Sequence, residues 1–371
     1  MPQEGQPNNH SQNVFTQKMN AKKKLLLIGA GPTSSLISYN IAKNAKLKNA
    51  VDIHVFEKSR GIGGRFATSR STKNPDCLAD LGAQYLTQSQ SKQSLKPYFE
   101  TLTKAALVRP LETSAIPGFR VDPTKSHYAC VKGTSSIVKH FFEQASLEKT
   151  DMVFDCRVIK ISKAEPGKVE VTTEKQGTST FDIVISTMPV PQILQLENSS
   201  ELLADLDMKR NLSMVKYSTR FALGLFFDAE IRLASSAQPL NFIENDPVFR
   251  YWSIENLKRT GTYNEPTSVV LHTNINYGAE NAEEDKDALK PQLLEKTVEI
   301  IPEAASIPLD SVKSHKWRYS QVLESYAEKP GCIKLSDNIY AAGDGFSESG
   351  FEGCIYSAER AVAMIEASMN L

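Results

Sequence analysis

A glycine-rich turn between an apolar run and a helical stretch constrains this chain more than any other feature. Residues 25–28 form a short apolar run typical of a buried strand, and residues 33–45 have helical spacing. The turn between them reads Gly29-Ala30-Gly31-Pro32-Thr33-Ser34. Glycines permit a tight bend, and the amides of a helix N-terminus attract phosphate. The turn therefore predicts a dinucleotide pyrophosphate site; the alternative is a plain turn, because Ser34 replaces the third glycine of the fingerprint.

An acidic residue stands where the second strand is expected to end. Residues 51–56 predict a strand parallel to the first, and Glu57 follows it. A carboxylate at that place accepts hydrogen bonds from the hydroxyls of an adenosine ribose. Glu57 is therefore a predicted cofactor ligand, with an exposed surface charge as the alternative.

A second glycine loop comes soon after and reads Gly61-Ile62-Gly63-Gly64-Arg65. It is similar to the second phosphate-side loop of glutathione-reductase-type flavoproteins and amine oxidases. Its glycines let backbone amides close on phosphate oxygens, and Arg65 adds a charge-assisted contact or stacks on the cofactor. The alternative is a flexible hairpin loop.

A third motif lies near the C-terminus, where Asn338-Ile339-Tyr340-Ala341-Ala342-Gly343-Asp344-Gly345 has the form of a strand that stops at Gly-Asp. It resembles the closing FAD motif of the same flavoproteins, in which the acid binds the ribityl hydroxyls. The helix expected from residue 353 would direct its positive end at the flavin. Together the three motifs predict non-covalent FAD. Cys354 is expected to pack rather than to form a covalent flavin link.

The composition of the chain limits the kinds of binding partner to be expected. The 371 residues exceed what one ordinary core supports, so two domains are expected. Lys+Arg and Asp+Glu balance at 43 each, which favours neither nucleic acid nor an anionic membrane. No apolar run approaches the roughly 18 to 20 residues that span a bilayer. A small molecule is the expected partner.

The cysteines and the N-terminal residues indicate the cellular compartment in which the protein is expected. Five cysteines without a CxxC pair fit neither a disulfide framework nor a metal site, so reduced thiols and no bound metal are expected. The apolar run after Lys22 to Lys24 is shorter than the roughly 7 to 15 residues of a signal-peptide core. We expect a cytoplasmic protein, with secretion by an unconventional route as the alternative. Residues 1–20 predict a disordered tail.

The fold class expected is α/β, with a Rossmann-like FAD-binding domain of the glutathione-reductase type and a discontinuous α+β substrate domain. The FAD-binding domain is expected to comprise residues 21–90, 131–191 and 331–371, and the substrate domain residues 91–130 and 192–330. Helices are expected at 91–107, 135–144, 201–215, 285–300 and 353–369, and strands at 152–161, 168–173, 181–186, 220–227, 268–274 and 339–342.

Several longer segments resemble the renalase family of flavin oxidases over nearly everything from Lys24 onward. They are Asp80-Leu81-Gly82-Ala83-Gln84-Tyr85, residues 131–140, residues 187–196, residues 217–226, residues 316–322 and Gly343-Asp344-Gly345-Phe346. The resemblance implies a p-hydroxybenzoate-hydroxylase-like fold in which Thr33, Arg65, Gln84 and Tyr85 contact FAD. Val158 and Ile355 are also expected to contact it.

The resemblance also implies a reaction. Enzymes of this family look like oxidases of the 2- and 6-dihydro isomers of NAD(P)H, which they return to NAD(P)+ while oxygen becomes hydrogen peroxide. Loss of a hydride from a dihydropyridine yields an aromatic pyridinium directly, so no general base is required. No nucleophile pattern or carboxylate–histidine cluster stands out in the sequence. Its departures from the family, a long N-terminal tail and several substitutions in the substrate domain, leave the preferred substrate open.

His272 and Trp317 are the catalytic candidates, and each has a structural alternative. His272 can bind a substrate carboxamide, but a lining histidine satisfied by its neighbours is the commoner case. Trp317 and Trp252 can wall the ring site or fill a core. The cations Arg250, Lys258, Arg259 and Arg318 can meet dinucleotide phosphates, although isolated cations are usually solvated surface charges.

Two rival functions remain open at the level of sequence. The cofactor loops suit an amine or catecholamine oxidase equally well, because a fold does not fix a function. A non-catalytic secreted signalling protein that retains FAD is the other rival. Bleaching of the flavin under anaerobic conditions would separate them.

Overall fold

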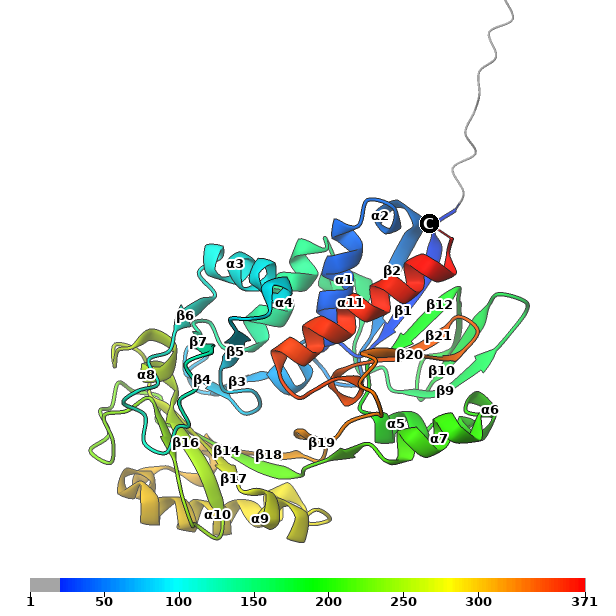
Figure 1. The fold of residues 1–371 in the computed structure, drawn as a ribbon. Helices are drawn as coiled ribbons and strands as arrows, with labels where there is room; N and C mark the ends of the chain where they lie inside the picture. Colours follow the sequence, from blue (N-terminus) through cyan, green and yellow to red (C-terminus); the bar gives the residue numbers. More distant parts are fainter. Residues whose placement is uncertain (1–20, 371) are drawn as a thin grey trace, which may run out of the picture.

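The structure is a computed structural model that describes residues 21–370, so the predicted tail over residues 1–20 lies outside the described residues. Figure 1 shows two lobes: a large sheet with its helices on one side, and a smaller sheet backed by α9 and α10 on the other. None of the helices within residues 21–370 combines the length and apolar character that a membrane crossing demands.

The first lobe is built on a six-stranded sheet. β1 (Lys23–Ile28) is buried from Leu25 onward and pairs in parallel with β2 (Val51–Phe56) and β12 (Ile183–Ser186). β12 is buried along its whole length, as expected for a central strand covered on both faces. The order is β20-β21-β12-β1-β2-β8, with β20 antiparallel to its neighbour. The edge strands are β8 (Met152–Val153) and β20 (Cys332–Ser336), and β21 (Ile339–Ala342) lies between β20 and β12.

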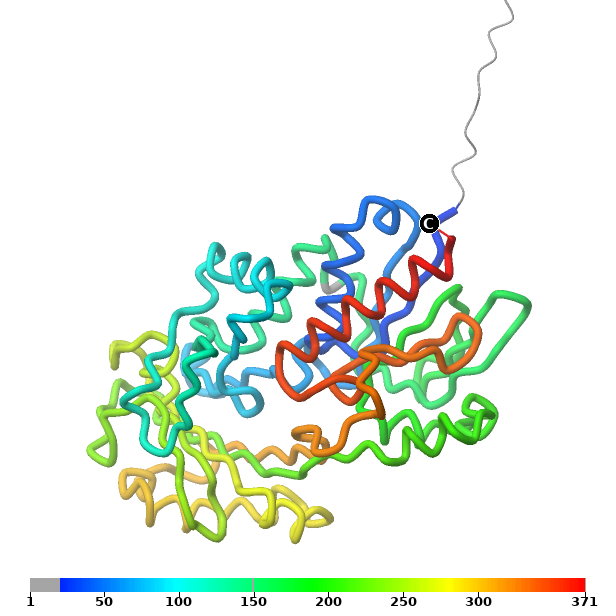
Figure 2. The backbone as a smooth tube through the Cα atoms, viewed as in Figure 1, coloured from blue at the N-terminus to red at the C-terminus, as the bar shows by residue number. Residues whose placement is uncertain are grey.

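Helices cover one face of this sheet. α1 (Pro32–Lys43) packs against both α4 (Ser135–Gln144) and α11 (Phe351–Ser368). Leu36 and Phe141 are fully buried in the core that they form. Figure 2 shows the blue first helix beside the red last one, so the two ends of the described chain meet in this lobe.

The opposite face is covered by an antiparallel meander and three short helices. Val171 of the meander and Leu212 of the helices share one core with Leu26 and Val184 of the sheet. The elements are β9 (Val158–Lys163), β10 (Val169–Thr173), β11 (Gly177–Phe181), α5 (Val190–Leu194), α6 (Ser199–Leu202) and α7 (Leu206–Ser213).

The second lobe is a five-stranded antiparallel sheet of order β15-β16-β17-β14-β18. One face packs on α9 and α10 through a core that includes Leu223, Trp252 and Leu271. Alternate residues therefore point to the other face, toward the first lobe. The elements are β14 (Arg220–Phe226), β15 (Leu240–Phe242), β16 (Phe249–Ile254), α8 (Glu255–Thr260), β17 (Ser268–Thr273), α9 (Ile275–Glu280), α10 (Lys286–Ile300) and β18 (Val312–Trp317).

Small sheets and short helices join the lobes. They are α2 (Leu47–Ala50), β3 (Thr68–Arg70), β4 (Leu78–Asp80), β5 (Leu86–Ser89), α3 (Lys96–Lys104), β6 (Val108–Pro110), β7 (Lys125–Cys130), β13 (Lys216–Tyr217) and β19 (Val322–Glu324). The five cysteines are buried free thiols, at Cys77, Cys130, Cys156, Cys332 and Cys354.

The predicted elements are confirmed in kind but several were too long. The helix expected over 91–107 is α3, shortened at its start because Pro97 fits only the first helical turn. The helix expected over 201–215 is broken into α6 and α7, and Asp205 caps the second by accepting the Met208 N–H. The strand expected over 152–161 is two strands, β8 and β9, which belong to different sheets. The one expected over 181–186 likewise divides between β11 and β12.

Candidate active site

Two of the predicted phosphate loops touch each other. Gly29 has φ +108°, and its N–H donates to Phe56 O at 2.7 Å, which bends the chain out of β1. The Gly63 N–H donates to Ala30 O at 2.9 Å. A Cβ added to Gly64, which has φ +54°, would lie 3.3 Å from Gly31 Cα, whereas a Cβ on Gly31 would meet nothing within 4 Å. The loops thus pack edge to edge and leave room beside Gly31.

The N-terminus of α1 faces that room. Its N-cap is Gly31, no side chain in the described part of the chain caps it, and Pro32 has no N–H to satisfy. Ser34 is fully buried and shares a 2.9 Å hydrogen bond with Thr187 Oγ1, so this side chain holds the helix against β12. The first-turn amides, including that of Thr33, are the groups that suit a diphosphate.

Glu57 joins the first loop to the end of β2. Its Oε2 accepts the Ala30 N–H and its Oε1 accepts the Ser59 N–H, both at 2.7 Å. The side chain is 7% exposed, so the surface-charge alternative is wrong. Each oxygen keeps a further lone pair with which to accept a ribose hydroxyl.

The second and third motifs are held together by an ion pair. Arg65 Nη1 and Nη2 donate to the two carboxylate oxygens of Asp344 at 2.6 and 2.7 Å, and the guanidinium lies 5.7 Å from the ring centroid of Tyr217. Burial lowers the pKa of Arg65, but the Asp344 carboxylate more than offsets this and the pKa lies above its ordinary value. The sequence predicted separate cofactor contacts for these residues and did not predict their pairing.

The other predicted cofactor residues near Asp344 and α11, together with Val158, are buried. Gly345 packs so closely on Tyr217 that a Cβ there would lie 2.4 Å from the phenol oxygen. Burial raises the pKa of Cys354 to about 12, and its thiol interacts with the Thr33 side chain, which fits the predicted packing role. Ile355 lies in the core below α11, and Val158 lies in the core beneath the meander.

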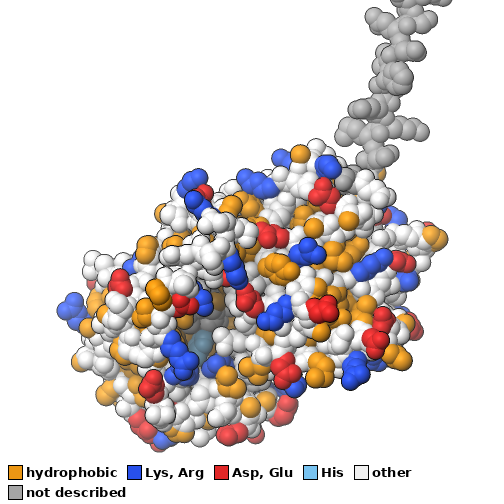
Figure 3. Space-filling view, in the orientation of Figure 1, with side chains coloured by type: hydrophobic (Ala, Val, Ile, Leu, Met, Phe, Trp, Pro, Cys, Tyr) orange, Lys and Arg blue, Asp and Glu red, His pale blue; other side chains and the backbone are white. Residues whose placement is uncertain are grey.

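The face of the five-stranded sheet that points away from α10 is apolar where Ala222, Phe226 and Val270 pack on Leu81, and polar elsewhere. We call the polar part the polar face. It carries Tyr251 and Ser253 from β16, His272 from β17, and His315 and Trp317 from β18. Figure 3 shows a recess between the two lobes with histidine surface at its floor. Trp317 Nε1 donates to Leu81 O at 2.6 Å, so this tryptophan borders the first lobe, whereas Trp252 belongs to the core on the opposite face.

Gln84 connects this polar face to the first lobe. Its Oε1 accepts from Tyr251 OH at 3.1 Å, Ser253 Oγ at 3.3 Å and Lys258 Nζ at 3.0 Å. Because an ammonium group only donates, the orientation of the amide is fixed. Its Nε2 consequently faces His272 Nε2, 3.3 Å away.

His272 is a neutral imidazole. Burial, followed by the charges of Arg220 and Lys258, lowers its pKa to about 3. The Gln84 amide nitrogen that faces this ring also donates to Asp80 O at 2.5 Å and to Gly82 O at 3.1 Å. His315 also has a lowered pKa, about 4, mainly through burial, and its ring centroid lies 4.0 Å from that of Trp317.

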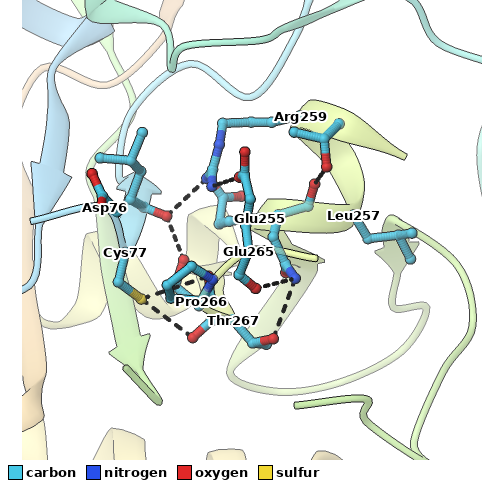
Figure 4. A network of polar contacts seen from close by, with 12 residues as sticks. Asp76, Cys77, Glu255, Leu257, Arg259, Glu265, Pro266 and Thr267 are labelled. Atoms are coloured by element: carbon cyan, nitrogen blue, oxygen red, sulfur yellow. Dashed lines mark hydrogen bonds and ion pairs between the residues drawn. The ribbon is translucent and has the colours of Figure 1, made fainter. Parts of the chain in front are cut away.

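Lys258 and Arg259 are fully buried, so the prediction of solvated surface cations is wrong for both. Lys258 Nζ lies 2.5 Å from Glu255 Oε1, and neither side chain is exposed. Arg259 donates to Leu78 O at 2.9 Å and pairs with Glu265 at 3.2 Å. Figure 4 shows Arg259 turned inward toward Glu265, beside Cys77 with its contacts to Pro266 and Thr267. The charges of Lys258 and Arg259 are therefore paired within the protein where the two lobes meet. We call this contact region the joint between the lobes.

Two more residues complete the joint. Burial raises the pKa of Asp80, with Lys258 opposing and Glu255 adding to the effect. Its Oδ1 accepts from Thr68 and Thr134, and its N–H donates to Glu255. Tyr85 packs on Phe119 and His127, at the edge of the small sheet β5-β7-β6.

Comparison with known families agrees with this geometry. The profile described as "Flavin containing amine oxidoreductase" matches residues 116–365, and that of an NAD(P)-binding Rossmann-like domain matches residues 27–102. The chain is therefore an FAD-dependent oxidoreductase with a Rossmann-like cofactor layer, and FAD is its cofactor.

A curated relative defines the kind of FAD-dependent oxidoreductase more closely. Renalase of Mus musculus is 32% identical over 339 residues, which cover 90% of this chain and 96% of the mouse protein. The chain belongs to the flavin-containing amine oxidoreductase family as a renalase-like flavin oxidase.

Solved structures support the fold. A putative protoporphyrinogen oxidase from Exiguobacterium sp. 255-15 superposes with a TM-score of 0.68 at 13% identity, covering 94% of this chain and 99% of its own. A putrescine oxidase A394C mutant gives 0.65 at 10% identity, with coverage of 93% and 99%. At these identities the likeness concerns architecture.

Proposed function

We propose that this protein oxidises the 2- and 6-dihydro isomers of NAD(P)H to β-NAD(P)+ and passes the electrons to oxygen, giving hydrogen peroxide. The observation that carries the proposal is the neutral, amide-bonded His272 on a polar face where Glu255 is held in a buried ion pair and Asp80 Oδ1 accepts hydrogen bonds from Thr68 and Thr134. Such a face suits a reaction that moves a hydride and abstracts no proton. The mouse relative named renalase supports the same reaction class.

The balance of the reaction explains why so little acid–base machinery is needed. The dihydropyridine loses one hydride, two electrons with one hydrogen nucleus, and becomes the aromatic pyridinium. FAD, when bound, supplies the two-electron acceptor, and one proton from solvent completes the reduction of oxygen to hydrogen peroxide. The protein positions the ring and excludes water.

In this proposal the first lobe binds the cofactor through Gly29, Gly31 and Thr33 and through the Gly64 loop, with Glu57 toward the ribose. Arg65 and Asp344 join the loops that meet the diphosphate and the ribityl chain. Gln84 and Tyr85 contact FAD, and His272 and Trp317 line the site of the substrate ring. Residues 21–90, 131–191 and 331–371 serve the cofactor, and residues 91–130 and 192–330 serve the substrate.

Anaerobic mixing of the purified holoprotein with each substrate tests the proposal. The 2- or 6-dihydro isomer of NADH should bleach the flavin absorbance within seconds, and the product should be β-NAD+. Bleaching by a catecholamine or another amine instead would favour amine oxidation, the activity named by the family profile. No bleaching by either would favour a non-catalytic role.

We propose separately that the protein resides in the cytoplasm. Five buried free thiols are compatible with a reducing cytoplasm. Fractionation of cells that express the full chain should recover it with cytosolic markers, whereas recovery from the medium would favour export.

A further inference from the structure

A β-bulge places an arginine on the polar face of the substrate sheet. Phe249 pairs with Thr273 and Tyr251 pairs with His272, so Arg250 is the extra residue between them. Bulges redirect side chains and are common beside active sites. The Arg250 guanidinium lies 5.7 Å from the Phe242 ring centroid, and that ring packs on Tyr251 at 5.1 Å. Arg250 therefore lies with Tyr251 on the face that carries His272.

A second arginine reaches the same place from β14. Ala222 pairs with His272, and Arg220 lies two residues earlier, so its side chain shares the face of His272. Its Nη1 donates to Thr273 O at 2.8 Å, next to the bulge. The charge of Arg220 helps to lower the pKa of His272, and that of Arg250 helps to lower the pKa of Arg220, which is consistent with this closeness.

Neither charge is neutralised. Within residues 21–370, no carboxylate lies within 4.0 Å of Arg220 or Arg250, and both are only partly exposed. Their hydrogen bonds go to Thr273 O, Ile243 O and the Gln321 amide. Arg65, Arg259 and Arg318 each have an acidic partner. Two partly desolvated like charges are costly unless an anion joins them.

We propose that Arg220 and Arg250 form a binding site for the diphosphate of a dinucleotide substrate. The inference rests on the proposed function and extends it, because it assigns the non-reacting half of the substrate to named residues. Guanidinium groups match phosphate oxygens with two parallel N–H donors. A nicotinamide ring beside His272 then has its diphosphate directed along the face toward the bulge.

The test compares two substrates in R220Q, R250Q and the double variant. One is the 6-dihydro isomer of NADH, and the other is the matching dihydronicotinamide riboside, which has the same ring and no phosphate. The ratio of kcat/KM for the dinucleotide to that for the riboside should fall on the order of tenfold for each arginine, the effect expected for a hydrogen bond to a charged group. The matched control is R157Q, which removes an arginine already paired with the exposed Glu174 and should keep the wild-type ratio.

A second measurement does not depend on the reaction. Inorganic pyrophosphate titrated into the holoprotein should bind the wild type and R157Q, and bind R250Q on the order of tenfold more weakly. An unchanged substrate ratio in all variants, or equal pyrophosphate binding in wild type and R250Q, would overturn the assignment. If no dihydronicotinamide bleaches the wild type while pyrophosphate binding still depends on Arg250, the proposed function fails and the anion site stands. Thermal melting and flavin content identify any variant that is misfolded.

Discussion

The two lobes build their halves of the site in different ways. In the first lobe, short loops of consecutive residues present backbone amides, and glycines such as Gly29 and Gly64 allow the conformations that this requires. In the second lobe, side chains from separate strands converge with Gln84 from a loop of the first lobe, and no two of Gln84, Tyr251 and His272 are near in sequence. Backbone recognition leaves a motif in the sequence, whereas recognition by converging side chains depends on strand register.

The joint between the lobes belongs to neither type. Glu255 and Lys258 form a buried ion pair on α8, and Lys258 also fixes the orientation of Gln84. The polar face therefore depends on charges that do not face the substrate. Substitutions in the two lobes should therefore have different effects. Those in the first lobe should weaken FAD binding, and those in the second lobe or the joint should lower stability or substrate selectivity.

The largest effect is expected from G29A. Gly29 has φ +108°, and an added Cβ would lie 2.8 Å from Thr187 Oγ1, which is held by Ser34 and Ile28. Strain and clash together should lower FAD affinity by on the order of tenfold or more, seen as a lower flavin-to-protein absorbance ratio. G167A is the matched control, because Gly167 also has a positive φ but has open space around it. Equal flavin content in both variants would contradict backbone recognition.

K258M should cause the largest loss of stability. Removing one partner of a buried ion pair leaves the Glu255 carboxylate without its counter-charge, at a cost of about 3–5 kcal/mol in the free energy of unfolding by urea. The double variant E255Q/K258M should recover part of that loss. K296M removes a lysine with the same i,i+3 spacing to an exposed glutamate, Glu299, and should change little. Similar losses in K258M and K296M would mean that the joint is unimportant.

D344N tests the link between the cofactor loops. It removes the charge that Arg65 meets, and because Arg65 is 27% exposed the expected cost is lower, about 2 kcal/mol in urea unfolding. FAD content should fall as well, since the two motifs lose their connection. D337N, at an exposed ion pair with Lys334, is the control and should match wild type in both measurements. Reduced flavin without reduced stability would assign Asp344 to the cofactor alone.

The sequence was sufficient to locate the cofactor loops of the first lobe, because each loop consists of residues that are consecutive in the chain. The strand–turn–helix at Gly29, the carboxylate at Glu57 and the closing strand before Asp344 were all located correctly, since their spacing along the chain reflects their geometry. The pairing of Arg65 with Asp344 spans 279 positions, and no local pattern indicates it. The roles assigned to these residues toward FAD stay predictions.

The second lobe shows what a single sequence lacks. β16 is buried at every residue except Arg250, and both its bulge there and its register against His272 are set by tertiary packing. Lys258 and Arg259 were expected at the surface because lysine and arginine are seldom buried without a partner. The available signal was the i,i+3 spacing of Glu255 and Lys258, which by itself is as common on exposed helices.

The smallest effect concerns the pH dependence of stability in H272Q. The folded pKa of His272 is about 3, below its ordinary 6.5, so between these values the unfolded chain binds a proton that the folded chain does not. The stability of the wild type is therefore complete above about pH 6.5 and falls as the pH drops toward 3. Between pH 7 and 5 the wild type should lose about 1–2 kcal/mol more than H272Q in urea unfolding. Flavin reduction should show no titration of this histidine between pH 5 and 8. An equal loss of stability in both proteins would mean that folding leaves the pKa of His272 at its ordinary value, so that the polar face has a titrating imidazole available for acid–base chemistry.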